Sequence, residues 1–157
     1  MKIVRACLLL LLTAPAAGLA AVQQLSPVER RIVTEVDARA EEAIALLERL
    51  VNINSGTMNF EGVREVGRIL GEELEALGFE VELTDGSGYD RAGHLVARRA
   101  GQGSGPHLLL IGHLDTVFEP DSPFQTFVRD GDRADGPGVV DMKGGDVVIV
   151  HALSALA

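Results

Sequence analysis

Residues 107–115 read HLLLIGHLD, and this stretch decides the fold that the sequence predicts. Its first part, from His107 to Gly112, is a continuous apolar run of the kind that forms a buried strand, expected here in the centre of a sheet. Two polar residues, His113 and Asp115, follow the predicted strand directly. Because ligands bind beyond the strand ends of α/β sheets, these two side chains are candidate site residues.

The residues before this strand predict two helices. Residues 26–29, SPVE, combine an N-cap serine, a proline at the first helical position and a capping-box glutamate. Apolar residues then recur at helical spacing to about Val51, which predicts one long amphipathic helix. The same periodicity from Val63 to Leu77 predicts a second helix that ends at Gly78, a common C-cap residue.

Two strands and a last helix complete the predicted order. Residues 79–83 alternate apolar and acidic side chains, as in a half-buried strand, and a turn leads to a second strand at about residues 94–99. Residues 101–106, GQGSGP, predict a flexible hairpin connection into the apolar run. Residues 144–157 are apolar on nearly every face, which is typical of a helix buried against a sheet. This order of elements predicts an α/β domain.

The first 20 residues predict a secretory signal peptide. Lys2 and Arg5 precede an apolar run at residues 6–12, and small residues allow cleavage after Ala20. An N-terminal membrane anchor is the alternative, but the run is shorter than a membrane-spanning helix requires. We therefore expect an exported protein, secreted or periplasmic, with no membrane contact after cleavage.

Composition limits the classes of function. The 157 residues are 46% hydrophobic and 24% charged, a globular composition for about one domain. The net charge of -9 argues against binding to nucleic acid or anionic membranes, which requires clustered Lys and Arg. Cys7 is the only cysteine and lies within the predicted signal peptide, so histidine and carboxylate side chains would have to hold any metal.

His113 and Asp115 have the spacing of a metal ligand and its hydrogen-bond partner. In an extended segment, side chains two residues apart point to the same side. The imidazole of His113 can then bind a metal ion while the Asp115 carboxylate accepts its other N–H. On spacing alone, a polar strand end without further function explains the pair equally well.

A second candidate segment, residues 135–146, reads DGPGVVDMKGGD. Its glycines and proline predict a tight loop that presents Asp141 just before a helix, and a carboxylate there can bridge two metal ions. A phosphate-binding loop is the alternative, because glycine-rich turns before helices also bind anions. The three carboxylates and the absence of a Gly-Lys-Ser/Thr ending make it the weaker alternative. Lys143 in this segment is interpreted as a solvated loop residue.

These segments together resemble the family of acetylornithine deacetylases, succinyl-diaminopimelate desuccinylases and glutamate carboxypeptidases, and most of all its carboxypeptidase G-like members. The likeness runs from about Leu46 onward and is carried by residues 50–57 (LVNINSGT), 113–117 (HLDTV), 123–124 (PF) and 136–145. It implies that residues 21–157 are the N-terminal, incomplete part of a zinc-exopeptidase catalytic domain. That domain has a mixed sheet flanked by helices, and the family's inserted lid and dimerisation domain is absent from these residues.

The resemblance also implies an activity and a site. His113 would be a ligand of one zinc ion, Asp141 would bridge two zinc ions, and Asp115 would be the catalytic residue that orients His113. The peptide bond after Asp141 is often cis in this family. A metal-activated water would hydrolyse an amide bond next to a free carboxylate in a small peptide or acyl-amino acid, and the full-length parent is expected to be a homodimer. Met142 is more typical of the deacetylase branch, so an N-acyl-amino-acid deacylase is an alternative.

The last predicted helix reaches Ala157 without a glycine cap, a polar tail or a proline, which we interpret as truncation. The paired glutamates, the further acidic ligand and the final histidine of the family would then follow downstream. A stable zinc site normally takes four ligands. The 157 residues alone are therefore expected to be inactive, and a non-catalytic module is the rival hypothesis.

Overall fold

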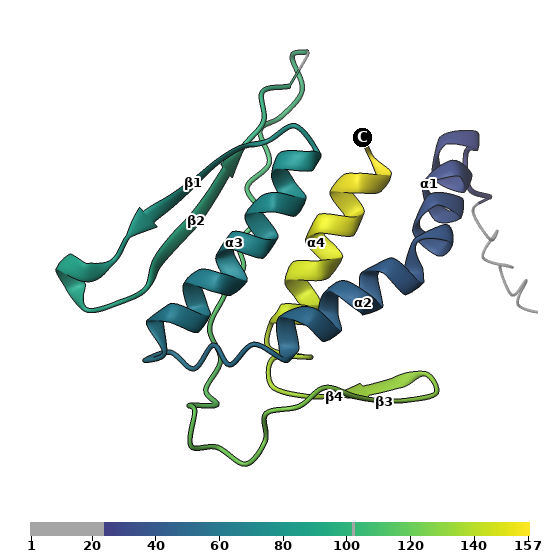
Figure 1. Ribbon diagram of the computed structural model, residues 1–157. Coiled ribbons are helices and arrows are strands. Elements are labelled where there is room, and N and C mark those ends of the chain that lie inside the picture. Colours follow the sequence, from purple (N-terminus) through teal and green to yellow (C-terminus); the bar gives the residue numbers. More distant parts are fainter. Residues whose placement is uncertain (1–23, 102) are drawn as a thin grey trace, which may run out of the picture.

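The structure, a computed structural model, describes residues 24–101 and 103–157, so the predicted signal peptide lies outside it (Figure 1). Helices and short antiparallel sheets make up the described chain, which confirms the α/β class. Across these residues we find no helix with both the length and the hydropathy of a transmembrane span. The elements, in chain order, are α1 (Pro27–Ala38), α2 (Ala40–Val51), α3 (Phe60–Ala76), β1 (Glu80–Asp85), the 3-10 turn η1 (Ser87–Tyr89), β2 (Gly93–Arg98), β3 (Val128–Asp130), β4 (Arg133–Asp135) and α4 (Lys143–Ala155).

The long helix predicted up to Val51 is wrong, because the chain breaks into α1 and α2 at Arg39. The predicted capping box is confirmed: Ser26 N donates to Glu29 Oε2 at 2.6 Å, and Glu29 N donates to Ser26 Oγ at 3.2 Å. Arg39 leaves the helical conformation with φ -107° and ψ 10°. The apolar spacing continues in phase through this residue, so periodicity alone does not reveal the break.

Helix α3 packs against the hairpin formed by β1 and β2. The two strands pair antiparallel from Glu80 opposite Arg98 to Asp85 opposite Gly93, as the sequence predicts for this region. A Cβ atom added at Gly71 would lie 3.1 Å from Val81 Cγ1, so the glycine allows the close approach of helix and strand. The helix ends before Gly78, whose φ of 81° confirms the predicted C-cap glycine.

The prediction of a buried central strand at residues 107–112 is wrong for the described structure. The segment has no strand assignment, and Leu108, Leu109 and Ile111 are 85%, 82% and 76% exposed. A buried strand needs hydrogen-bonded neighbours, and within the described residues β1 and β2 pair only with each other. The hairpin connection expected at residues 101–106 includes residue 102, which lies outside the described residues, and residues 103–106 lead into no strand of the described chain. Apolar composition indicated burial, but burial depends on a partner strand that these residues do not supply.

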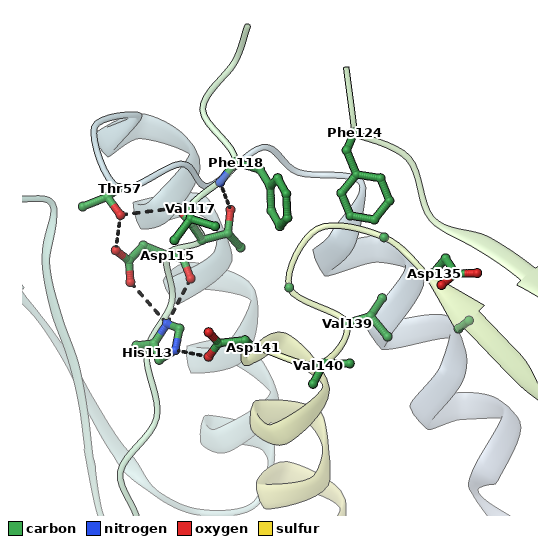
Figure 2. A pocket seen from close by; sticks show the side chains of 14 residues that line it. Thr57, His113, Asp115, Val117, Phe118, Phe124, Asp135, Val139, Val140 and Asp141 are labelled. Atoms are coloured by element: carbon green, nitrogen blue, oxygen red, sulfur yellow. Dashed lines mark hydrogen bonds and ion pairs between the residues drawn. The ribbon is translucent and has the colours of Figure 1, made fainter. Parts of the chain in front are cut away.

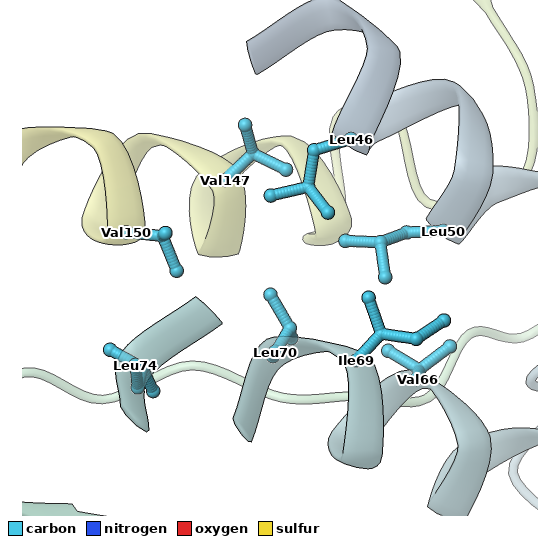
Figure 3. Close-up of a cluster of buried hydrophobic side chains, with 8 residues drawn as sticks. All are labelled: Leu46, Leu50, Val66, Ile69, Leu70, Leu74, Val147 and Val150. Carbon is cyan, nitrogen blue, oxygen red and sulfur yellow. The ribbon is translucent and has the colours of Figure 1, made fainter. Parts of the chain in front are cut away.

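The core lies between three helices, α2, α3 and α4, which Figure 3 shows at close range. Leu50 on α2 and Val66 on α3 are completely buried, and Val147 and Val150 cover them from α4. Full burial of one such side chain contributes about 1.5–3 kcal/mol. Helix α4 was expected to pack on a sheet, but it contacts α1, α2 and α3 instead, which corrects that prediction. The core members are Leu46, Leu50, Val66, Ile69, Leu70, Leu74, Val147 and Val150.

Candidate metal centre

The segment that carries His113 and Asp115 is fixed by main-chain contacts to the loop after α2. Thr116 N donates to Ser55 O at 2.8 Å, and Thr57 N donates to Thr116 O at 3.0 Å. Gly56 and Thr116 form a parallel bridge, although neither belongs to a longer strand. Two chain segments about sixty residues apart are thereby held side by side. This pairing fixes the backbone on which His113 and Asp115 stand.

His113, Asp115 and Asp141 come together at one end of a cleft (Figure 2). The Nε2 atom of His113 is 2.8 Å from Asp141 Oδ1. Its Nδ1 atom is 3.0 Å from the backbone oxygen of Asp115 and 3.3 Å from Asp115 Oδ1. The three residues singled out from the sequence are therefore neighbours in space, and the imidazole lies between the two aspartates.

The surroundings of His113 change its proton affinity. Burial alone would lower the pKa of His113, but its hydrogen bonds to the Asp141 side chain and the Asp115 backbone outweigh burial and raise this pKa above 6.5. When protonated, the ring donates from Nε2 to Asp141 and from Nδ1 to Asp115. A metal ion would therefore compete with a proton for Nε2.

The loop that presents Asp141 is tightly built, as its glycines and proline predict. Gly138 has a φ of 83°, a backbone angle that residues with a side chain rarely adopt. A Cβ atom there would lie 2.9 Å from Thr116 Cγ2. Pro137 is fully buried. The peptide bond between Asp141 and Met142 is cis, as the resemblance implied. The loop thus packs directly on the segment of Thr116 and sets Asp141 opposite His113.

Lys143 is not a solvated loop residue, and that prediction is wrong. Its side chain is completely buried, and Nζ donates to Leu50 O and Ile53 O, both at 2.8 Å. Leu50 O lies in the last turn of α2 and also accepts from Ile53 N at 3.2 Å, while Ile53 O lies just beyond the helix. Burial lowers the pKa of Lys143 to about 8, against the attraction of Asp146. Lys143 therefore ties the loop of Asp141 to the end of α2.

Thr57 is a further site residue that the sequence interpretation missed. It lines the cleft, and its Oγ1 atom donates to Asp115 Oδ2 at 2.5 Å. The motif of residues 50–57 was noted for its resemblance only, and no local pattern predicts which distant carboxylate its threonine meets. Lys143 did carry a signal, since it is the only lysine between residues 24 and 157 and stands next to two glycines at a helix start.

The cleft has a volume of about 410 Å³ and an acidic, partly apolar lining. Phe118 and Phe124 meet edge to face with ring centroids 5.0 Å apart, and Figure 2 shows them above the loop of Val139 and Val140. Three of the lining residues are aspartates, and His113 is the one basic side chain among them. Such a lining favours a bound cation over an anion.

The residues present fit a metal ion in kind. Imidazole nitrogen and carboxylate oxygen are both common zinc ligands, each at about 2.0–2.2 Å from the metal. His113 Nε2 and Asp141 Oδ1 are 2.8 Å apart, so the two donor atoms lie at the same point of the cleft. Within residues 24–101 and 103–157, however, no group of three or more His, Cys, Asp or Glu side chains is arranged to hold a metal. The described chain thus offers a pair of donors where about four are usual.

Several known proteins are similar to this chain in sequence. Residues 109–157, which contain both candidate ligands, match the description "Peptidase family M20/M25/M40". The chain is 38% identical over 150 residues to carboxypeptidase G2 of Pseudomonas sp. strain RS-16, covering 93% of this chain and 34% of that protein. It is also 37% identical over 120 residues to succinyl-diaminopimelate desuccinylase of Gluconacetobacter diazotrophicus, covering 73% of this chain and 30% of that protein.

The described chain is an α/β domain in which one histidine and two aspartates meet at a cleft. The chain belongs to peptidase family M20/M25/M40 and is similar to carboxypeptidase G2. It spans about a third of the length of the curated relatives it matches.

Proposed function

We propose that the protein is a metal-dependent hydrolase that cleaves an amide bond next to a free carboxylate in a small peptide or acyl-amino acid. The observation that carries this proposal is the 2.8 Å approach of His113 Nε2 and Asp141 Oδ1 at the mouth of an acidic cleft. The names of the relatives, a carboxypeptidase and a desuccinylase, support amide hydrolysis.

His113, through its imidazole, and Asp141, through its carboxylate, are the residues that would hold the metal, with zinc as the proposed ion. When bound, the metal supplies Lewis-acid activation of water and of the substrate carbonyl. His113 contributes its Nε2 lone pair, and the N–H at Nδ1 stays on the backbone oxygen and carboxylate of Asp115. Asp115 thereby fixes which ring nitrogen carries the proton.

The cleft beyond the two donors accommodates the substrate. Val139, Val140 and the pair of Phe118 and Phe124 form an apolar wall that removes water from a bound acyl group. Asp135 lies in the same cleft. We further propose that the protein is exported and acts as a homodimer. An N-acyl-amino-acid deacylase of the same family is the second candidate, favoured by Met142 after the cis bond.

The test uses the protein produced from its complete reading frame. We expect hydrolysis of N-acyl-glutamate and other N-acyl-amino acids that is lost on chelation and restored by added zinc. We expect His113→Ala to lower kcat by more than a hundredfold, within the range of about 10²–10⁴ for a residue of the reacting centre. His94→Ala, an exposed histidine on β2, is the matched control.

Turnover that is insensitive to chelation would contradict metal dependence. Equal activity of the His113 and His94 variants would contradict the placement of the site. A preference for N-acetylated amino acids other than glutamate, over N-acyl-glutamate, would favour the deacylase candidate. Absence of hydrolysis on every amide substrate, with the folded protein in hand, would support the rival non-catalytic module.

A further inference from the structure

Thr57 is distant in sequence from His113 and Asp141, yet its hydroxyl lies at the carboxylate that faces the imidazole. Thr57 Oγ1 is 2.5 Å from Asp115 Oδ2 and 3.3 Å from the backbone oxygen of Thr116. A hydroxyl has one proton to donate, and a carboxylate is the stronger acceptor, so the proton goes to Asp115. Figure 2 shows the continuous line of contacts that results, from Thr57 through Asp115 and His113 to Asp141.

The two oxygens of Asp115 have separate partners. Oδ2 accepts from Thr57, while Oδ1 lies 3.3 Å from His113 Nδ1. A carboxylate held at one oxygen cannot rotate to present that oxygen elsewhere. The contact with Thr57 therefore keeps Oδ1 directed at the imidazole.

The position of Thr57 does not depend on this hydrogen bond alone. The backbone of Thr116 pairs with Ser55 on one side and with Thr57 on the other. Asn54 Nδ2 also donates to Phe118 O at 2.9 Å, two residues further along the same segment. The loop would therefore stay in place without the hydroxyl, which separates the role of the hydroxyl from that of the backbone.

We propose that Thr57 is a positioning residue of the metal centre. By holding one oxygen of Asp115, its hydroxyl keeps the other oxygen on His113 Nδ1. In the neutral ring, Asp115 at Nδ1 competes with Asp141 Oδ1 at Nε2 for the single proton, so this contact favours the tautomer whose Nε2 is free to bind a metal. This inference rests on the proposed metal-dependent function. Partners beyond the first ligands typically change metal affinity or activity by about 10–100-fold when they are removed. Because Thr57 acts through Asp115, we expect the lower end of this range.

The experiment compares Thr57→Val, which removes the hydroxyl but keeps the shape, with Thr57→Ser, which keeps the hydroxyl. Thr84→Val is the matched control, because Thr84 Oγ1 also bonds to a backbone oxygen, that of His94, but on the hairpin away from the site. Two quantities are measured on the full protein. They are the zinc dissociation constant, by competition with a chelator, and the tautomer of His113 in the metal-free protein, by 15N NMR at a pH where the ring is neutral.

We expect Thr57→Val to weaken zinc binding about tenfold and to populate the second tautomer of His113. Thr57→Ser and Thr84→Val should remain close to wild type in both measurements. In an Asp115→Ala background, Thr57→Val should have no further effect on zinc binding, because the two residues act in series. In kinetics, the loss should appear in kcat, with KM nearly unchanged.

The inference is overturned if Thr57→Val binds zinc like wild type and leaves the tautomer unchanged, or if Thr57→Ser is impaired equally. Additive losses in the Asp115→Ala background would likewise assign Thr57 a structural role. Thr57→Ala serves if valine is not accommodated, and unfolding of both variants would identify the hydroxyl as a folding determinant instead. If wild type binds no zinc, the proposed function fails, while the tautomer measurement still decides whether Thr57 orients His113.

Discussion

Replacing Lys143 by methionine tests how the loop of Asp141 is anchored. The ammonium group is completely buried and is bonded to Leu50 O and Ile53 O. Methionine fills a similar volume but removes this donor. Leu50 O keeps its bond from Ile53 N, so the loss falls mainly on Ile53 O, at about 1–3 kcal/mol for an unsatisfied buried group. It also removes a charge whose burial is unfavourable. The two effects oppose each other, so the loss at neutral pH is expected to be small.

The pH dependence gives the sharper expectation. The pKa of Lys143 is about 8 in the folded protein, against the ordinary lysine value of 10.5 that applies to an unfolded chain. Between these values the unfolded chain binds more protons than the folded protein, so the free energy of unfolding rises with pH in this window. At about 1.4 kcal/mol for each pH unit between the two values, the rise amounts to roughly 3 kcal/mol. The Lys143→Met variant lacks the group and should lack this rise.

Urea unfolding followed by circular dichroism at about pH 7 and about pH 10 measures the effect. We expect the stability difference between wild type and Lys143→Met to widen in favour of wild type by roughly 2–3 kcal/mol between these conditions. Arg68→Met, which removes an exposed cation on α3, is the control and should leave the pH dependence unchanged. The same pH dependence in wild type and Lys143→Met would refute the conclusion that burial lowers the pKa of Lys143.

Four further outcomes follow from the described contacts. Leu50→Ala, at a completely buried core position, should lower the free energy of unfolding by about 2–5 kcal/mol in urea titrations. Gly138→Ala should cost about 1–3 kcal/mol in the same assay, because φ is 83° there. Glu41→Gln, which breaks an exposed ion pair with Arg129, should leave the melting temperature unchanged. Zinc affinity should fall as pH decreases, and from a higher pH than for an ordinary histidine, because the pKa of His113 is raised; calorimetric titration at several pH values checks the sign.

Local signals in the sequence predicted most of the helices and the hairpin. The capping box at Ser26 and the glycine at position 78 act within a few residues, so they were found where expected. The break at Arg39 was not, because apolar residues keep their spacing through it. The run from Leu108 to Ile111 was wrongly predicted for another reason. Its apolar composition indicates burial, but the described chain holds no strand that pairs with it, and its side chains are exposed.

The candidate site was predictable in its residues but not in its supports. His113, Asp115 and Asp141 have side chains that bind metals, and spacing and resemblance drew attention to them. Their convergence depends on contacts between segments far apart in sequence. The bond from Thr57 to Asp115 and the bonds from Lys143 to the end of α2 have no local signature. Residue type likewise predicts a lysine at the surface, whereas this one is buried.

The exposure of the candidate metal-binding pair, His113 and Asp141, explains why buried supports are needed. The side chains of His113 and Asp141 are 45% and 83% exposed, and an ion pair so accessible to water contributes little to folding. It therefore cannot hold its own 2.8 Å geometry. The rigidity has to come from the buried contacts of the backbone. Lys143 and the tight turn at Gly138 fix the backbone of Asp141, and the pairing around Thr116 fixes that of His113. A metal ion would then find its donors already placed, and the free energy of ordering them would have been spent in folding the domain instead of in binding the ion.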